Sequence, residues 1–241
     1  MASEKSYHCE VKSFCDDETF LLPRFLPQEY VASCKVMANR AELIRQLPKG
    51  GVVAEIGTQK GEFAHTISQI ATPDQLHLFD LDFSKFDRTQ FTEEEMHRIF
   101  INEGDSSTLL SKFPKHYFDW IYIDGDHSFD GVSKDIKQAK KKIKPGGYLV
   151  FNDYTIYSPF EKMQYGVMRA VNHLCLAHNY EICFFALDIC DYPDVAVRKR
   201  TKGGEPALDT LVWPILDPEV IRPVSLTSLS ATEIAQIDIW G

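Results

Sequence analysis

Acidic, amide and histidine side chains recur after short apolar runs along the 241-residue sequence. They lie at residues 55–61, 80, 103–105, 124–127 and 152–153. Each preceding apolar run is typical of a buried strand, and amphipathic segments of helical period lie between the runs. Ligands of an open α/β sheet bind beyond the carboxyl ends of its strands, so these residues are predicted to surround one ligand site.

The loop after the first apolar run contains Gly57 and Gly61, which let the backbone turn tightly and approach a ligand closely. The loop matches neither the dinucleotide GxGxxG pattern nor a P-loop. Acidic residues surround it, which suits a ligand with ribose hydroxyls and positive charge better than one with phosphates. Taken alone, the loop is equally consistent with an ordinary strand-to-helix turn.

A second group of polar residues ends two strands that are predicted to be neighbours, about 5 Å apart. Its members Asp124, Asn152 and Asp153 offer oxygen ligands of the kind that a hard divalent cation such as Mg²⁺ prefers. His127 follows three residues after Asp124, and an imidazole that titrates near neutral pH suits a general base for a hydroxyl proton. The alternative is that His127 caps the next helix or packs in its loop.

The elements that must position these groups alternate along the chain. A helix is predicted over 28–47, strands over 52–56, 76–79, 99–101, 118–123 and 148–151, and helices over 62–70, 132–143 and 165–177. Strands over 181–187 and 195–198 form an edge hairpin. The predicted fold is Rossmann-like α/β, with a mostly parallel seven-stranded sheet, an antiparallel edge hairpin and helices on both faces. Thr92 and Glu95 have capping-box spacing, which predicts a short helix within an insertion over 83–98.

Three regions follow from this pattern: an N-terminal irregular segment and helix (1–49), a ligand-binding domain (50–200) and a proline-containing C-terminal tail or lid (201–241). The chain carries 35 acidic and 26 basic residues, a net charge of −9, which argues against nucleic acid or an anionic membrane as partner. No apolar stretch approaches the roughly 20 residues that span a bilayer. Residues 1–10 are polar and contain no apolar signal core, so a cytoplasmic location is expected. The six cysteines form no CxxC pair, so reduced thiols are expected.

The polar motifs occur in a defined order: Glu55-Ile-Gly-Thr-x-x-Gly61, Phe79-Asp80, Glu103-Gly-Asp105, Ile123-Asp-Gly-Asp-His127 and Pro145-Gly-Gly-Tyr-Leu-Val-Phe-Asn-Asp153. Over residues 50–200 this order resembles the class I S-adenosylmethionine-dependent methyltransferases. It resembles most closely their metal-dependent macrolide-sugar O-methyltransferase branch. The sequence departs from that pattern at Thr58, where many class I enzymes have a second glycine, and at Asn152, where some relatives have glutamate.

The resemblance implies S-adenosylmethionine as cofactor and assigns roles by position. Gly57 and Gly61 would pass close to the methionine part, and Asp80 would accept hydrogen bonds from the ribose hydroxyls. Asp105, with Ser106 beside it, would lie near the adenine amino group. Two further residues complete the expected cofactor site: Glu55 and Asp124.

The resemblance also implies Asp124, Asn152 and Asp153 as metal ligands and His127 as the base. We therefore expect a metal-assisted O-methyltransferase of a small hydroxylated acceptor, a sugar or glycosylated natural product first and a phenol second. The alternatives are a metal-independent methyltransferase and a non-catalytic S-adenosylmethionine-binding protein. A homo-oligomer is left open, with the N-terminal helix and the tail as the segments that could mediate assembly.

Overall fold

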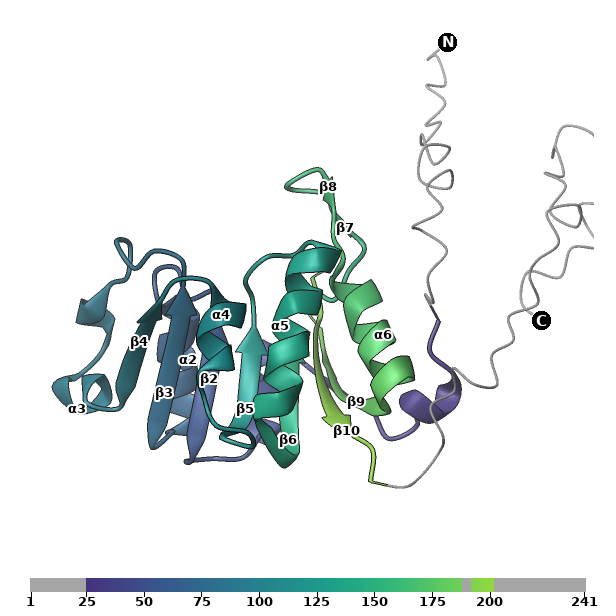
Figure 1. The fold of residues 1–241 in the computed structure, drawn as a ribbon, viewed down its shortest axis with the longest axis horizontal. Coiled ribbons are helices and arrows are strands. Elements are labelled where there is room, and N and C mark those ends of the chain that lie inside the picture. The colour runs from purple at the N-terminus through teal and green to yellow at the C-terminus, as the bar shows by residue number, and fades with distance from the viewer. Residues whose placement is uncertain (1–24, 188–191, 202–241) are drawn as a thin grey trace, which may run out of the picture. The chain divides into compact units, whose positions relative to one another are not determined.

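A computed structural model describes residues 25–187 and 192–201, which form an α/β fold around one large sheet (Figure 1). The sheet has eight strands in the order β1-β9-β10-β6-β5-β2-β3-β4. Strand β10 runs antiparallel to β6 and β9, and the other pairs are parallel. The strands are β1 (Lys35–Met37), β2 (Val52–Ile56), β3 (Gln75–Asp80), β4 (Ile99–Glu103), β5 (Phe118–Ile123), β6 (Ile143–Phe151), β9 (Tyr180–Ala186) and β10 (Asp194–Lys199). The predicted Rossmann-like fold class is confirmed.

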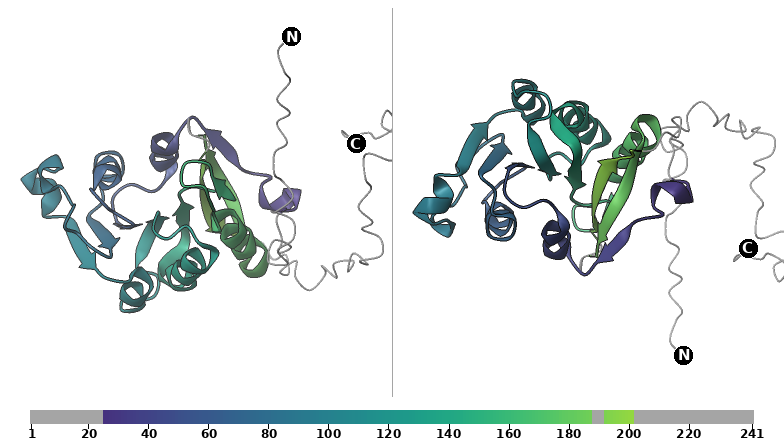
Figure 2. Two further views of the ribbon diagram at one scale, coloured as in Figure 1. Left: turned by 90° about the horizontal axis from the view of Figure 1, so that it is seen from above. Right: turned by 90° about the horizontal axis from the view of Figure 1, so that it is seen from below.

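Helices cover both faces of the sheet (Figure 2). One face carries α1 (Arg40–Gln46) and α2 (Glu62–Ala71), and the other carries α4 (Ser106–Ser111), α5 (Phe129–Lys142) and α6 (Val167–His178). Short helices η3 (Gln28–Tyr30), η4 (Arg88–Gln90) and α3 (Glu93–Met96) lie in the connections. A separate hairpin, β7 (Tyr157–Ser158) and β8 (Met163–Gln164), follows β6. Within 25–187 and 192–201, no helix has the length and apolar character needed to span a membrane.

The central strands are apolar because both of their faces are covered. Val53, Leu78, Trp120 and Val150 belong to the buried core. Helix α2 turns Ala64, Ile67 and Ala71 toward this core at helical spacing. Burying these apolar faces holds the carboxyl ends of the parallel strands at one edge of the sheet, where the polar motifs lie.

The predicted helix over 28–47 is wrong in its first half. The structure has η3 over 28–30, then β1, and α1 begins only after Asn39, whose side chain accepts a hydrogen bond from the Glu42 N–H at 2.9 Å. Residues 35–37 pair with residues 184–186 of β9 instead, so a long-range ladder overrides the local helical spacing. Strand β1 also makes the sheet eight-stranded, so the β9–β10 hairpin lies inside the β1 edge.

The insertion over 83–98 contains the predicted short helix. Thr92 is the N-cap of α3, and both hydrogen bonds of the capping box with Glu95 are present. The Glu95 carboxylate also accepts hydrogen bonds from Ser68 and Gln69 of α2, which fastens the insertion to the core. The expected tail or lid over 201–241 lies outside the described residues from 202 onward, as do residues 1–24.

Candidate active site

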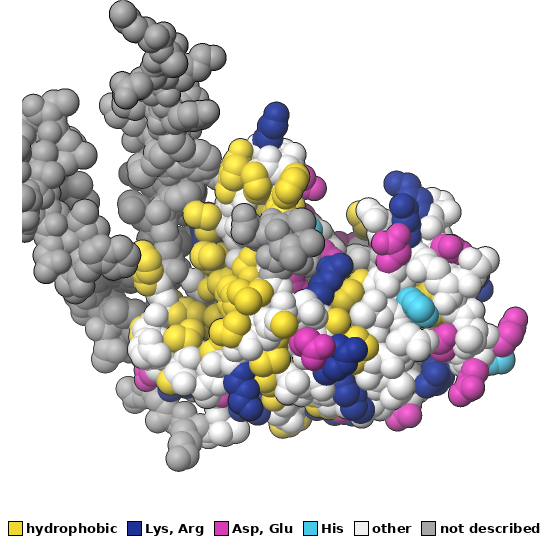
Figure 3. Space-filling model, turned by 180° about the vertical axis from the view of Figure 1, so that it is seen from behind, with side chains coloured by type: hydrophobic (Ala, Val, Ile, Leu, Met, Phe, Trp, Pro, Cys, Tyr) yellow, Lys and Arg dark blue, Asp and Glu magenta, His cyan; other side chains and the backbone are white. Residues whose placement is uncertain are grey.

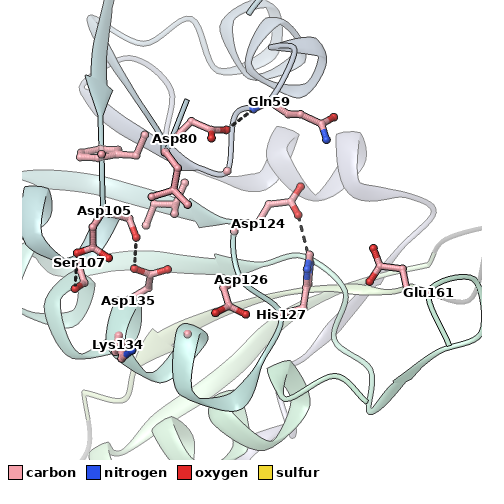
Figure 4. Close-up of a pocket in the computed structure, with 18 residues that line it drawn as sticks. Gln59, Asp80, Asp105, Ser107, Asp124, Asp126, His127, Lys134, Asp135 and Glu161 are labelled. Carbon is pink, nitrogen blue, oxygen red and sulfur yellow. Dashed lines mark hydrogen bonds and ion pairs between the residues drawn. The ribbon is translucent and has the colours of Figure 1, made fainter. Parts of the chain in front are cut away.

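A cavity of about 750 Å³ opens at the carboxyl ends of β2, β3, β4 and β5 (Figure 4). The predicted site residues that line it are Gly57, Asp80, Asp105, Ser106, Asp124 and His127. The predicted residues that are not part of its lining are Glu55, Gly61, Asn152 and Asp153. Parallel strands therefore bring most of the polar motifs to one cavity, as expected for an open α/β sheet.

Gly57 allows the first loop to lie directly against the Asp124 loop. Its φ is +87°, a conformation that favours glycine, and a Cβ there would stand 1.9 Å from the Asp124 carbonyl oxygen. The Gly57 N–H donates to the Phe79 carbonyl at 2.8 Å, which ties the loop to β3. Gly61 also has φ +87°, but a Cβ there would meet the Phe86 ring at 2.5 Å. Gly61 therefore makes room for the insertion.

Asp80 stands at the end of β3 and braces the glycine loop. Its carboxylate accepts a hydrogen bond from the Gln59 N–H at 2.7 Å and a longer one from the Asp82 N–H at 3.3 Å. Figure 4 shows the Asp80–Gln59 contact at the rim of the cavity. This fixes the carboxylate where a ligand hydroxyl could donate to it.

Asp105 is the N-cap of α4, and its Oδ1 makes the capping hydrogen bond. That oxygen accepts hydrogen bonds from the Thr108 N–H at 2.7 Å and the Ser107 hydroxyl at 3.1 Å, and the Thr108 bond is the main reason that the Asp105 pKa is lowered. The neighbouring Ser106 hydroxyl donates to Asp135 Oδ1 at 2.5 Å. Burial raises the pKa of Asp135 to about 6.

Sequence reasoning missed several cavity residues: Gln59, Ser107, Lys134, Asp135 and Glu161. Of these residues, only Asp135 could have been recognised from the sequence pattern. It falls on the buried face of α5 together with Val132, Ile136 and Ala139, and an acid on the apolar stripe of a helix needs a polar neighbour. Its partner, Ser106, is the first residue of α4 and lies 29 residues earlier in the chain, so this pairing is known only from the fold.

His127 lies between two carboxylates at the other end of the cavity. Its Nε2 is 3.5 Å from Asp124 Oδ1 (Figure 4). The same nitrogen is 3.4 Å from Asp153 Oδ2, and the ring stacks on Tyr165 with centroids 4.6 Å apart. Burial lowers the pKa of His127, but Asp124 and Asp153 outweigh it and leave the pKa above its usual value. Burial raises the pKa of Asp124, although His127 opposes that shift.

Asn152 and Asp153 follow the end of β6, whose Phe151 pairs with Ile123 of β5, next to Asp124. The Asn152 amide N–H donates to Asp194 Oδ1 at 3.0 Å, and the Asn152 side chain also forms a hydrogen bond with His127 that helps to raise the His127 pKa. The side-chain oxygen is the atom of Asn152 that could bind a metal ion. Among residues 25–187 and 192–201, no group of three or more His, Cys, Asp or Glu side chains is arranged to hold a metal ion. The chemistry of the predicted donor set, two carboxylates and one amide oxygen, still fits a hard cation.

Comparisons with known proteins agree with this architecture. Residues 54–154 match the family model of a methyltransferase domain. A segment of 56 residues is 39% identical to an uncharacterized protein of Acanthamoeba polyphaga mimivirus and covers 23% of this chain and 24% of that protein. The chain therefore spans about a quarter of that relative.

Solved structures share the fold at low identity. The pyocyanin biosynthetic protein PhzM is similar with a TM-score of 0.53 and 14% identity, over 68% of this chain and 55% of that one. An S-adenosylmethionine-dependent methyltransferase from Aquifex aeolicus is similar with a TM-score of 0.50 and 13% sequence identity, over 66% of this chain and 89% of that one. The tRNA methyltransferase TrmK of B. subtilis is similar with a TM-score of 0.50 and 13% sequence identity, over 71% of this chain and 68% of that one. Residues 54–154 therefore match a methyltransferase-domain family model, and the chain shares the fold of these methyltransferase structures.

Proposed function

We propose that this chain transfers the methyl group of S-adenosylmethionine to a hydroxyl of a small molecule, with His127 as the general base. The observation that carries the proposal is the position of His127. It lines the cavity, and its Nε2 is held within 3.5 Å of Asp124 and Asp153. Binding a cofactor needs no base flanked by carboxylates, so this arrangement favours catalysis over a non-catalytic binding protein.

The proposed cofactor site is the part of the cavity between Gly57 and Asp105. Asp80 would accept hydrogen bonds from the ribose hydroxyls, and Asp105 and Ser106 would lie near the adenine. The acidic lining supports this assignment because carboxylates attract the sulfonium cation. Glu55, buried behind the loop, would support the methionine end indirectly.

The reaction itself is an in-line displacement. The acceptor oxygen forms a bond to the methyl carbon as the carbon–sulfur bond breaks, and the hydroxyl proton passes to the His127 imidazole. Asp124 and Asp153 stabilise the imidazolium that results. Holding the two reacting atoms in contact distance supplies a large part of the acceleration.

We further propose that Mg²⁺, held by oxygen atoms of Asp124, Asn152 and Asp153, assists this step, as the resemblance to the macrolide-sugar branch implies. When bound, such an ion lowers the pKa of the acceptor hydroxyl. The test is methyl transfer after treatment with EDTA, followed by titration of Mg²⁺. Full activity in EDTA, retained in Asp153→Ala, would reject the metal and favour the metal-independent alternative in which His127 acts alone.

The base is tested by His127→Gln, with His173→Gln on the exposed face of α6 as control. Calorimetry with S-adenosylhomocysteine and an acceptor screen read by mass would be run on both variants. We expect His127→Gln to keep cofactor affinity and to lose roughly 10²–10⁴-fold in kcat. An unchanged kcat would remove His127 from the mechanism, and failure of the wild type to bind the cofactor would remove the proposed function.

A further inference from the structure

Four rings form a continuous series from the candidate base to the protein surface, which we call the aromatic column. His127 stacks on Tyr165 with an interplanar angle of 14°. Tyr165 lies 6.2 Å from Tyr192, and Tyr192 lies 5.8 Å from Phe160, measured between ring centroids. These separations fall within the range of favourable aromatic contacts.

The inner end of the column is fixed by the backbone. The Gly166 N–H donates to the His127 carbonyl at 2.7 Å, and a Cβ on Gly166 would stand 2.1 Å from the Phe129 nitrogen. The chain after Tyr165 therefore lies directly against the His127 loop. The Tyr165 hydroxyl donates to Glu161 at 2.6 Å, and Glu161 lines the cavity. The column is thus continuous with the candidate active site.

The outer end of the column lies on the β7–β8 hairpin, which projects beyond the carboxyl edge of the sheet (Figure 1). Ser158 is buried and shares a 2.7 Å hydrogen bond with the Tyr192 hydroxyl, which fastens the hairpin to the column. By contrast, Phe160 is 71% exposed and Met163 is 45% exposed. Figure 3 shows hydrophobic side chains gathered on this projecting part of the molecule.

We propose that the aromatic column binds the acceptor, and that the acceptor is a hydroxylated molecule with a flat aromatic body. This inference rests on the proposed function, because it needs a methyl acceptor at His127. The hydroxylated end enters the cavity toward His127, while the aromatic body packs against Phe160 and Tyr192. Met163, with its polarizable and flexible thioether, adapts to the edge of that body.

The arrangement favours an aromatic body over a bare sugar. A sugar is bound through several hydrogen bonds, but the hairpin side of the site presents rings and a thioether. The one cavity-lining charge on the hairpin, Glu161, is engaged by the Tyr165 hydroxyl. Exposed Phe160 gains contact when an apolar ring covers it, whereas a small polar acceptor would leave it in water. A glycosylated aromatic compound satisfies both ends, with a sugar hydroxyl at the base and the aromatic aglycone on the hairpin.

The test uses two probes that share one sugar, 2-naphthyl β-D-glucopyranoside and methyl β-D-glucopyranoside. Their affinities for the full chain saturated with S-adenosylhomocysteine would be measured by saturation-transfer NMR titration. We expect the naphthyl glucoside to bind about tenfold more tightly or better. Phe160→Ala should reduce this preference about fivefold, because an aromatic contact is lost. Tyr192→Phe keeps the ring but removes the hydrogen bond to Ser158, so it should reduce the preference less than Phe160→Ala does.

Phe100→Ala is the matched control, because Phe100 is an exposed aromatic residue on β4, at the opposite edge of the sheet. It should leave the preference for the naphthyl glucoside unchanged. Equal affinity for both glucosides, no binding of either at millimolar concentration, or an equal effect of Phe160→Ala and Phe100→Ala would overturn the inference. If the cofactor product binds and the naphthyl preference is absent, only this inference fails. If the cofactor product does not bind, the proposed function fails with it.

Discussion

Replacing Asp135 by asparagine should stabilise the folded protein by an amount that grows with pH. Asp135 is 5% exposed, and burial raises its pKa from the ordinary 3.8 to about 6 while the Ser106 hydrogen bond opposes the shift. The folded state therefore holds this proton more tightly than the unfolded chain. The protonated Asp135 carboxyl therefore does not destabilise the folded wild-type protein below pH 3.8. Folding stability is lost as the pH rises from 3.8 through about 6.

The magnitude follows from the size of the shift. A difference of about 2.2 pKa units corresponds to about 3 kcal/mol of folding free energy lost above pH 6. Linkage gives a loss of about 1 kcal/mol at pH 4.5 and about 3 kcal/mol at pH 8. Asparagine keeps the shape of the side chain and cannot ionise. The difference in unfolding free energy between Asp135→Asn and wild type should therefore increase by about 2 kcal/mol from pH 4.5 to pH 8, in favour of the variant.

Urea unfolding of both proteins at pH 4.5, 5.5, 6.5 and 8, followed by circular dichroism, measures this difference. Asp130→Asn, which removes an exposed carboxylate from the first turn of the same helix, controls for the loss of one acidic side chain from α5. A stability difference between Asp135→Asn and wild type that stays constant over this pH range would refute the reasoning.

Three further substitutions test individual contacts of the fold and the site. Gly57→Ala should cost more than about 3 kcal/mol, seen as a lower melting temperature, because its Cβ would stand 1.9 Å from the Asp124 carbonyl; a wild-type melting temperature would contradict the loop geometry. Thr92→Ala should lower the free energy of unfolding by about 1 kcal/mol through loss of the capping box with Glu95, and no change in urea unfolding would show that the cap is dispensable. Asp80→Ala should weaken S-adenosylhomocysteine binding roughly tenfold or more in calorimetry, and equal affinity would remove Asp80 from the cofactor site.

Several features of the site could be predicted from the sequence because they depend on residues close together in the chain. The alternation of apolar runs and helical periods predicted the sheet, and the position of Asp80, Asp105 and Asp124 after such runs placed them at one edge. The capping box of Thr92 and Glu95 was predicted for the same reason, since its hydrogen bonds join residues three apart. The cofactor and base roles of these residues stay predictions.

Other features required the tertiary structure. Residues 35–37 have local helical spacing but form β1, because they pair with β9 about 150 residues later. Ser106 with Asp135, and Tyr165 with Tyr192, likewise meet across 29 and 27 residues. The sequence by itself determined which segments are apolar, where they end and what chemistry follows them. Only the fold decided which of those ends and rings meet, because strand pairing and helix packing gain their free energy from partners that local spacing does not identify.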